Sequence, residues 1–289
     1  MEKDKKKFTI AGYSFDRIIA YFTIYSVAGF VIETIFGAVT KGVIESRQSF
    51  VYGPFCAIYG VGALAMILLL RYCKKNFKSL FIGGFIVGSI VEYIVSLIGE
   101  LIFHVKWWDY SDMPLKINGR VCVYFSIFWG FIAVCFLQYI HPHIEKLIDK
   151  IQQKFSEKFL KGIIVFLFIF QLIDLFLTGF ALEMFIIRKV HEHDLNVAGK
   201  AFMEVRYNRY CENKTLSKMI NQFFNDRKMI RTFPNLKIQD VNGAIIYFDT
   251  LVGDIQPYYY KFHFRQKKEE RTDYVQEMLD DLHNEIKKE

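Results

Sequence analysis

The chain has 289 residues, of which 53% are hydrophobic and 30 are Phe, and its formal charge at pH 7 is +7. This hydrophobic content is too high for an ordinary soluble fold of that length. Lys and Arg that flank apolar segments are typical of the cytoplasmic loops of membrane proteins. The basic balance therefore does not require nucleic acid, and we expect no nucleic-acid partner.

The amino-terminal residues carry Lys3, Lys5, Lys6 and Lys7 ahead of a long apolar segment. That segment is too long for a signal peptide and lacks a small-residue cleavage site. We therefore expect it to remain in the protein as the first membrane-spanning helix, with the amino terminus in the cytoplasm.

Five segments are long and apolar enough to cross the membrane, since a spanning helix needs about 20 residues. They are residues 18–39, 50–70, 80–103, 121–140 and 162–187. In the second segment, residues 52–55 include Gly53 and Pro54 and form either part of the span or a short re-entrant or broken element before a helix that begins at Ala57. The sequence predicts an all-α polytopic protein with a transmembrane domain over residues 1–187.

Residues 188–289 are predicted to form a soluble carboxyl-terminal segment of mixed α/β structure. Residues 200–224 have the apolar spacing of one or two amphipathic helices. Residues 236–241 and 244–250, joined by Asn242 and Gly243, are typical of a β-hairpin, with 258–264 as a third strand and 269–288 as a solvated helix. Five spans place this segment outside the cell, and a re-entrant element in place of one span reverses that side.

Two carboxylates lie inside predicted spans, Glu33 in the first and Glu92 in the third. Each has a small residue four positions before it and another four positions after it: Gly29, Gly37, Gly88 and Ser96. Residues at this spacing share one helix face, and an ionisable group at a helix centre costs about 2.5 to 3.5 kcal/mol on insertion scales. Both acids are therefore predicted to face inward, either as packing contacts between helices or as an ion, proton or substrate site.

The first four spans show a faint parallel duplication of a two-helix unit. Arg47 follows the first span and Arg120 the third, and a Gly-x-x-Cys sequence lies near the start of each following span, at 53–56 and 119–122. Two such hairpins related by a pseudo-twofold axis along the membrane normal would bring both arginines and both acids around one polar cavity. The alternative is that Arg47 and Arg120 contact lipid headgroups.

Three further residues are candidates for the same cavity. Asp109 and Asn118 join it if the loop after the third span folds back, although the adjacent Trp107 and Trp108 are typical of interfacial anchors. Asp174 shares a face of the fifth span with Gln171 and Thr178 and is the third inward acid.

The sequence contains no nucleotide-binding or hydrolase motif. There is no Walker sequence, dinucleotide fingerprint or nucleophile elbow, so this chain is not an ATPase and no catalytic residues are assigned. The pairs His141/His143 and His191/His193 lack helical zinc-site spacing and are predicted to lie in solvated loops. We expect no metal and no cofactor.

Several motifs occur in the order seen in one bacterial family. They are Tyr25-Ser-x-x-Gly-x-x-x-Glu33, the segment 49–60, Trp107-Trp-Asp-Tyr-Ser111, Ile117-Asn-Gly-Arg120 and Trp129-Gly130. Across residues 20–142 the chain resembles the ABC transporter permease family of CmpB type. The resemblance implies a multi-pass protein of the bacterial plasma membrane, and it departs from the usual family pattern at Ala28, Phe30 and Gln48.

Three functions are compatible with these patterns. The first is a transporter permease component in which Glu33 and Glu92 bind a cation or proton, with a separate ATPase subunit as partner if the transporter is of ABC type. The second is a membrane-embedded enzyme or sensor for a lipid-linked substrate that uses the same acids as general acid and base. The third is a membrane scaffold whose carboxyl-terminal segment recruits a partner. All three imply contact with membrane lipids.

Overall fold

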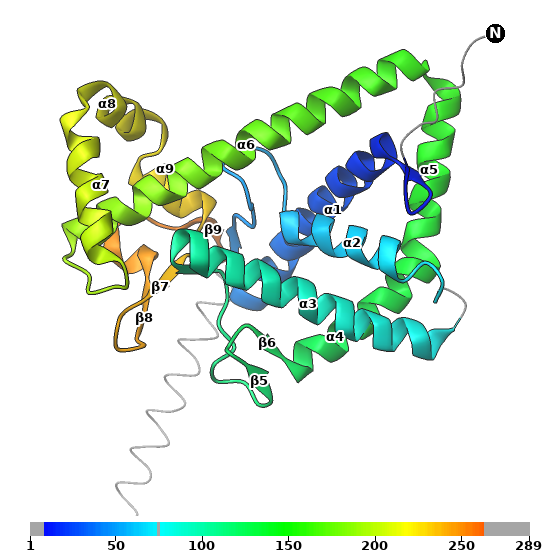
Figure 1. The fold of residues 1–289 in the computed structure, drawn as a ribbon, viewed down its shortest axis with the longest axis horizontal. Helices are drawn as coiled ribbons and strands as arrows, with labels where there is room; N and C mark the ends of the chain where they lie inside the picture. Colours follow the sequence, from blue (N-terminus) through cyan, green and yellow to red (C-terminus); the bar gives the residue numbers. More distant parts are fainter. Residues whose placement is uncertain (1–8, 74–75, 263–289) are drawn as a thin grey trace, which may run out of the picture.

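Long apolar helices dominate the structure (Figure 1). A computed structural model describes residues 9–73 and 76–262. Among these residues, four helices have the length and apolar character to cross a membrane. They are α1 (Phe15–Lys41), α3 (Phe77–Phe103), the continuous helix Val123–Lys154 and α6 (Glu157–Glu192). The chain is therefore a multi-pass membrane protein.

The predicted count of five spans is not confirmed, because the second predicted span is not one helix. Its helical part is α2 (Ala57–Leu69), whose 13 residues extend about 20 Å at 1.5 Å per residue, less than the hydrocarbon core of about 30 Å. The preceding residues 46–56 are irregular, yet Val51 and Phe55 are buried. This arrangement agrees with a short irregular element at residues 52–55 ahead of the helix that begins at Ala57.

Several backbone donors of the irregular segment and of the first residue of α2 are satisfied by neighbouring helices and by side chains of the segment itself. Cys56 N–H donates to the Ser26 carbonyl of α1 at 2.9 Å, and Ala57 N–H donates to Ser49 Oγ at 2.9 Å. Unpaired backbone groups are costly in hydrocarbon, so irregular chain persists at membrane depth only where protein satisfies it. These hydrogen bonds fix the irregular segment within the helix bundle.

The third long helix bends. It consists of α4 (Val123–Cys135), a single π-helical turn η1 (Phe136–Ile140) and α5 (His141–Lys154), and it changes direction around η1 (Figure 1). Pro142 has no N–H for the helix, which is a common cause of such a bend. The prediction that His141 lies in a solvated loop is wrong, because this residue is inside the helix with none of its surface exposed.

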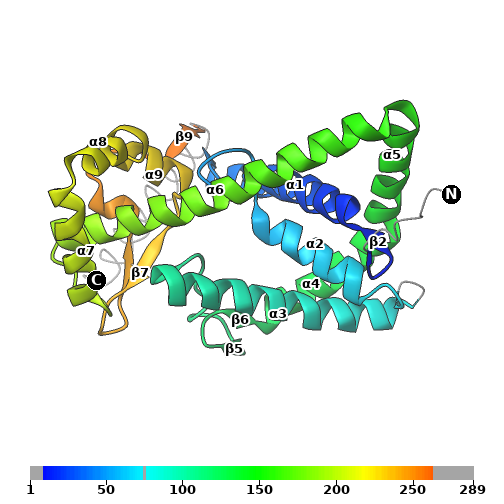
Figure 2. The same cartoon turned by 45° about the horizontal axis from the view of Figure 1, so that its top comes forward.

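The two ends of the bundle differ. The hairpin of β1 (Thr9–Ile10) and β2 (Tyr13–Ser14) and helix α5 lie at one end (Figure 2). At the other end, β3 (Val43–Glu45) and β4 (Val105–Lys106) pair with carboxyl-terminal strands, and the two-stranded hairpin of β5 (Lys116–Ile117) and β6 (Val121–Cys122) lies beside the start of α4 (Figure 1). Helices α1 and α3 therefore run in the same direction through the bundle.

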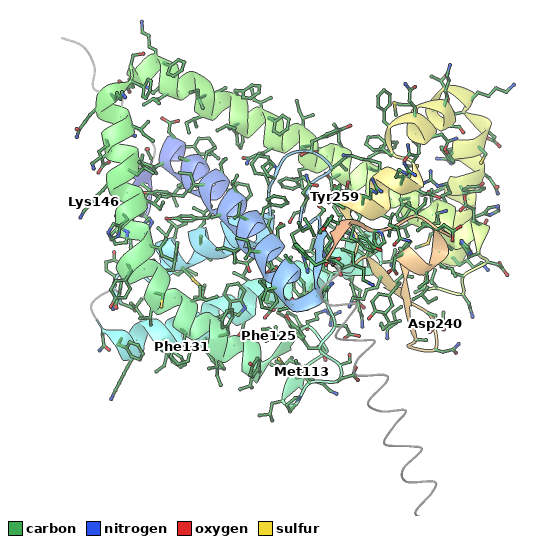
Figure 3. The ribbon with its side chains drawn as sticks, turned by 180° about the vertical axis from the view of Figure 1, so that it is seen from behind. Met113, Phe125, Phe131, Lys146, Asp240 and Tyr259 are labelled. Atoms are coloured by element: carbon green, nitrogen blue, oxygen red, sulfur yellow. The ribbon has the colours of Figure 1, made fainter. Side chains whose placement is uncertain are left out.

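The carboxyl-terminal elements are helices α7 (Lys200–Glu212), α8 (Lys214–Phe223) and α9 (Asp226–Thr232), followed by β7 (Lys237–Gln239), β8 (Ile245–Tyr247), η2 (Phe248–Leu251) and β9 (Tyr258–Lys261). The predicted amphipathic helices and the Asn-Gly hairpin are confirmed, with Gly243 at φ 90°. Asp240 lies in the connection of this hairpin (Figure 3). The predicted helix 269–288 lies outside the described residues.

The predicted third strand of the hairpin pairs elsewhere. Strand β9 pairs antiparallel with β3, which follows α1, and β7 pairs antiparallel with β4, which follows α3. Local sequence patterns predict strands but not distant partners, so the extension of the hairpin by β9 is wrong. The carboxyl-terminal strands are instead joined by main-chain hydrogen bonds to the strands that follow α1 and α3, the helices that carry Glu33 and Glu92.

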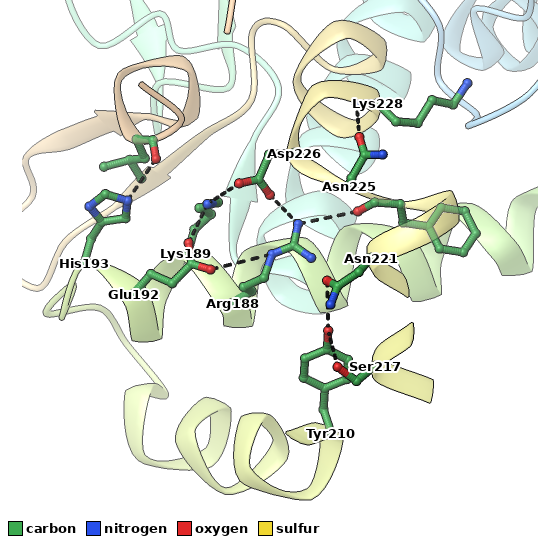
Figure 4. Close-up of polar contacts among 12 residues, drawn as sticks. Arg188, Lys189, Glu192, His193, Tyr210, Ser217, Asn221, Asn225, Asp226 and Lys228 are labelled. Atoms are coloured by element: carbon green, nitrogen blue, oxygen red, sulfur yellow. Dashed lines mark hydrogen bonds and ion pairs between the residues drawn. The ribbon is translucent and has the colours of Figure 1, made fainter. Parts of the chain in front are cut away.

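Helix α6 continues to Glu192, past the predicted boundary at residue 187, and its last turns form the core of the carboxyl-terminal elements. Two buried cations of this end, Arg188 and Lys189, form ion pairs with Asp226 in the first turn of α9 (Figure 4). Lys189 also pairs with Glu192. Because buried charges are tolerated only when paired, these contacts fix α9 against the end of α6.

Helix α3 shows how the sequence separates lipid from protein. Six isoleucines recur every fourth residue along one ridge of the helix, and all six are exposed: Ile82, Ile86, Ile90, Ile94, Ile98 and Ile102. A second series with the same spacing is offset from the isoleucines by two positions and is buried: Gly84, Gly88, Glu92 and Ser96. The bulky stripe is suited to lipid, and the small stripe lets α4 approach closely.

Candidate functional site

Glu92 is enclosed by aromatic donors. Its side chain accepts a hydrogen bond from Tyr110 Oη at 2.8 Å and another from Trp129 Nε1 at 3.3 Å, and the residue is 5% exposed. Tyr110 comes from the loop after α3, which folds back, and it stacks on Phe125, labelled in Figure 3. Burial and the adjacent Glu92 carboxylate raise the pKa of Tyr110, which keeps this phenol a donor.

Glu33 has a related but more open environment. Tyr59 Oη of α2 donates to its carboxylate at 2.7 Å, and Arg47 Nη1 lies 3.9 Å from the other oxygen. The Glu33 side chain is 29% exposed. Glu33 is therefore held by one aromatic donor and one distant cation, whereas Glu92 is held by two aromatic donors.

The small residue four positions before each acid makes room for the aromatic donor. A Cβ on Gly88 would lie 2.5 Å from Trp129 Cβ, and a Cβ on Gly29 would come closer still to the Tyr59 side chain. Either contact is too short for real atoms, so only glycine permits the approach. The inward stripes of the sequence thus position the partners of the acids.

The two helix pairs correspond at several positions. A shift of 59 positions superposes Phe22, Gly29 and Glu33 of α1 on Phe81, Gly88 and Glu92 of α3. A shift of 70 positions superposes Tyr59, Gly60, Ala63, Met66 and Ile67 of α2 on Trp129, Gly130, Ala133, Phe136 and Leu137. Gly60 packs close to Phe22 as Gly130 does to Phe81. These matches support the hypothesis of a duplicated two-helix unit, with Tyr59-Gly60 and Trp129-Gly130 as its most informative pairs.

The two acids are linked through their aromatic donors. The rings of Tyr59 and Trp129 lie 6.3 Å apart between centroids. Two sets of hydrogen bonds, Glu33–Tyr59 and Glu92–Trp129–Tyr110, are therefore joined by a ring contact between Tyr59 and Trp129. In a duplicated unit this aromatic contact marks the place where the two halves meet.

The arginines are bound mainly by other acids. Arg47 Nη2 lies 2.8 Å from the buried Glu45, closer than its approach to Glu33. Arg120 Nη2 lies 2.5 Å from Glu100, and the Arg120 guanidinium packs over the Tyr93 ring. Within the described part of the chain, Arg120 forms no ion pair with Glu92. Only Arg47 is thus close to the acid that the duplication assigns to it.

The other candidates occupy separate places. Asp109 Oδ1 accepts hydrogen bonds from the backbone and hydroxyl of Ser111, and Asn118 Nδ2 donates to Tyr93 Oη at 3.0 Å. Asp174 is buried and accepts the Tyr52 N–H at 3.2 Å on each carboxylate oxygen. Thr178, one turn further on, accepts the Val51 N–H at 2.9 Å. Asp174 therefore clamps the irregular segment before α2 onto α6.

Sequence reasoning missed several polar residues. Tyr59, Tyr110 and Trp129 were not predicted as site residues, although the recurring aromatic-Gly pair is a signal that points to two of them. A second polar cluster was also missed, in which Tyr25 Oη lies 2.8 Å from Nδ1 of the buried His141. Tyr21 Oη donates to Glu145 in the same cluster.

The fold and these contacts define an integral, multi-pass bacterial membrane protein with carboxylates held between its helices. A family model described as "Putative ABC-transporter type IV", of CmpB type, matches residues 20–179. This match covers more than half of the chain, and the protein belongs to that family. The matched residues include both helix pairs, apart from the first residues of α1, and most of α6.

A curated relative is the inner membrane-spanning protein YciB of Variovorax paradoxus (strain S110). It is 28% identical over 131 residues, which cover 41% of this chain and 68% of that protein. No solved structure matches the chain. The relative supports placement in a bacterial membrane.

Proposed function

We propose that this protein is the membrane-embedded permease component of a transporter, in which Glu33 and Glu92 hold a proton or a cationic group within the bundle. The observation that carries this proposal is the equivalent placement of two intramembrane carboxylates in the two helix pairs, linked by the Tyr59–Trp129 contact. Ionisable side chains are costly at membrane depth, and pairs of them facing a bundle interior are characteristic of ion and substrate paths. The family description supports transport as the activity.

Each site residue has a role in this proposal. Glu33, the more exposed acid, receives the cation, and Glu92 holds it deeper in the bundle. Arg47, 3.9 Å from Glu33 and paired with Glu45, lowers the affinity of Glu33 for a cation, since a nearby positive charge competes with a bound one. Arg120, Asp109, Asn118 and Asp174 position the connecting segments.

A separate ATPase subunit is the partner that the family description suggests. This chain has no Walker sequence, so any ATP-driven step requires a second protein. We propose that such a subunit associates with the full chain in the native membrane. Isolation of the protein from native membranes should then recover a nucleotide-hydrolysing partner, and a homogeneous preparation without ATP hydrolysis would argue for ion-driven transport instead.

The test is cation and proton flux into liposomes that contain the protein together with any copurifying subunit. We expect Glu33→Gln and Glu92→Gln to reduce flux about tenfold or more, because the neutral amide no longer balances a cation. The matched control is Glu157→Gln, which changes an acid exposed at the start of α6. Full flux in a correctly folded Glu33→Gln/Glu92→Gln double variant would refute the proposed site.

A further inference from the structure

A groove separate from the acid site lies among α6, α7 and α8. It has a volume of about 960 Å³, and its apolar walls include Phe180 and Met184 of α6 and Phe202 and Val205 of α7. Phe202 and Val205 are 63% and 59% exposed. Such large apolar side chains at an open groove are characteristic of a binding surface for an apolar or amphipathic ligand.

The position of this groove relative to the membrane follows from the exposed side chains of α6. Exposed apolar side chains of α6 run from Phe159 to Leu177, about 28 Å of helix at 1.5 Å per residue, which matches the hydrocarbon core. Phe180 and Met184 lie three and seven residues beyond Leu177, or about 5 to 10 Å further along the axis. The headgroup layer occupies about 5 to 8 Å on each side of the hydrocarbon. Measured along α6, the groove therefore begins where the lipid-exposed apolar surface ends, at the distance expected of lipid headgroups.

The polar side of the groove is basic. Its lining includes Arg206, Arg209 and Lys214 against one acid, Glu212. Arg206 is already paired with Glu183 and packs over the Phe202 ring, so it belongs to the wall. Among the residues that the structure describes, neither Arg209 nor Lys214 forms an ion pair. These two cations remain available to an anionic group.

We propose that this groove binds an anionic glycerophospholipid, with its phosphate between Arg209 and Lys214 and an acyl chain along Phe202 and Val205 toward α6. Charge and depth together select this occupant: basic pockets at headgroup level favour anionic lipids, and the apolar wall continues into the lipid-exposed surface of α6. Bound lipid in this place would tie the α7–α8 hairpin to the membrane surface.

The proposal is tested by native mass spectrometry of the full chain titrated with phosphatidylglycerol and phosphatidylcholine of identical acyl chains. We expect the wild type to bind phosphatidylglycerol about tenfold more tightly, and Arg209→Ala/Lys214→Ala to lose that preference. The matched control is Lys218→Ala/Arg227→Ala, which removes two exposed charges of the same region outside the groove.

Three outcomes overturn the proposal: equal binding of the two lipids by the wild type, an unchanged preference in Arg209→Ala/Lys214→Ala, or the same loss in the control. Thermal unfolding of each variant verifies that it is folded. A second variant, Phe202→Gln, tests the apolar wall independently at an exposed position. It should weaken binding of both lipids, whereas retention of full binding would rule out an acyl chain in the groove.

Discussion

The helix pairs α1–α2 and α3–α4 place an acid at the same position but treat it differently. In α3–α4, Glu92 is 5% exposed and receives two aromatic donors, one of them from a folded-back loop. In α1–α2, the Glu33 side chain is 29% exposed and receives one aromatic donor, with Arg47 at 3.9 Å. The same scaffold thus supports one sealed acid and one accessible acid.

This difference comes from the segments that connect the helices. The loop after α3 sends Tyr110 back onto Glu92, whereas the segment after α1 enters the bundle and is clamped by Asp174 and Thr178 of α6. The helices determine where each acid lies, and the connections determine what reaches it. Four predictions test this division, from the largest expected effect to the smallest.

Glu92→Leu should destabilise the protein far more than Glu33→Leu. Without Glu92, the Tyr110 hydroxyl and the Trp129 indole N–H lose their acceptor in a buried place, which costs about 2 to 6 kcal/mol for the two groups. Glu33→Leu leaves only the Tyr59 hydroxyl without its acceptor, at a more exposed site, and should cost about 1 to 2 kcal/mol. Thermal unfolding in detergent measures both, and equal losses would contradict the difference between sealed and accessible acids.

Gly29→Ala and Gly88→Ala should each destabilise the protein by about 1 to 3 kcal/mol, because the added methyl group forces the aromatic donor away. Gly62→Ala in α2 is the control, since nothing lies within 4 Å of its added Cβ. That control should be neutral or slightly stabilising, because Ala favours a helix. Similar losses at all three positions would show that helix propensity, and not close approach, is responsible.

Asp174→Leu should release the segment before α2 with a loss of about 2 kcal/mol, because the Tyr52 N–H loses its acceptor. Asp174→Asn retains an acceptor and serves as the control. Local release is measured by hydrogen exchange of residues 49–56, which should accelerate in Asp174→Leu alone. Equal exchange in both variants would remove Asp174 from its clamping role, while the α3–α4 pair should be unaffected in either case.

Tyr59→Phe and Trp129→Phe should have the smallest effects, about 0.5 to 1.5 kcal/mol each, because each removes one donor and keeps an aromatic ring. A double-mutant cycle between these two positions should show coupling, since their rings are in contact. If the two substitutions changed the free energy of unfolding additively, the two halves of the site would be energetically independent and the predicted coupling would be wrong.

The small residues spaced four positions from Glu33 and Glu92 were sufficient to predict which faces of α1 and α3 look inward. They work because small residues every fourth position must meet another helix and bulky apolar ones tolerate lipid. The length of α2 was not predictable in this way, since residues 50–56 are as apolar as a span while their backbone is irregular. Apolar composition reports depth in the membrane but not main-chain conformation.

The sequence by itself determined the membrane class, the inward faces with Glu33 and Glu92, and the local carboxyl-terminal helices and hairpin. All of these depend on residues a few positions apart. Only the tertiary structure decided that Tyr59, Trp129 and Tyr110 reach the acids, that Arg120 pairs with Glu100, and that β9 joins β3. These contacts join residues distant in the chain, and their geometry depends on how helices pack, which no short-range periodicity encodes.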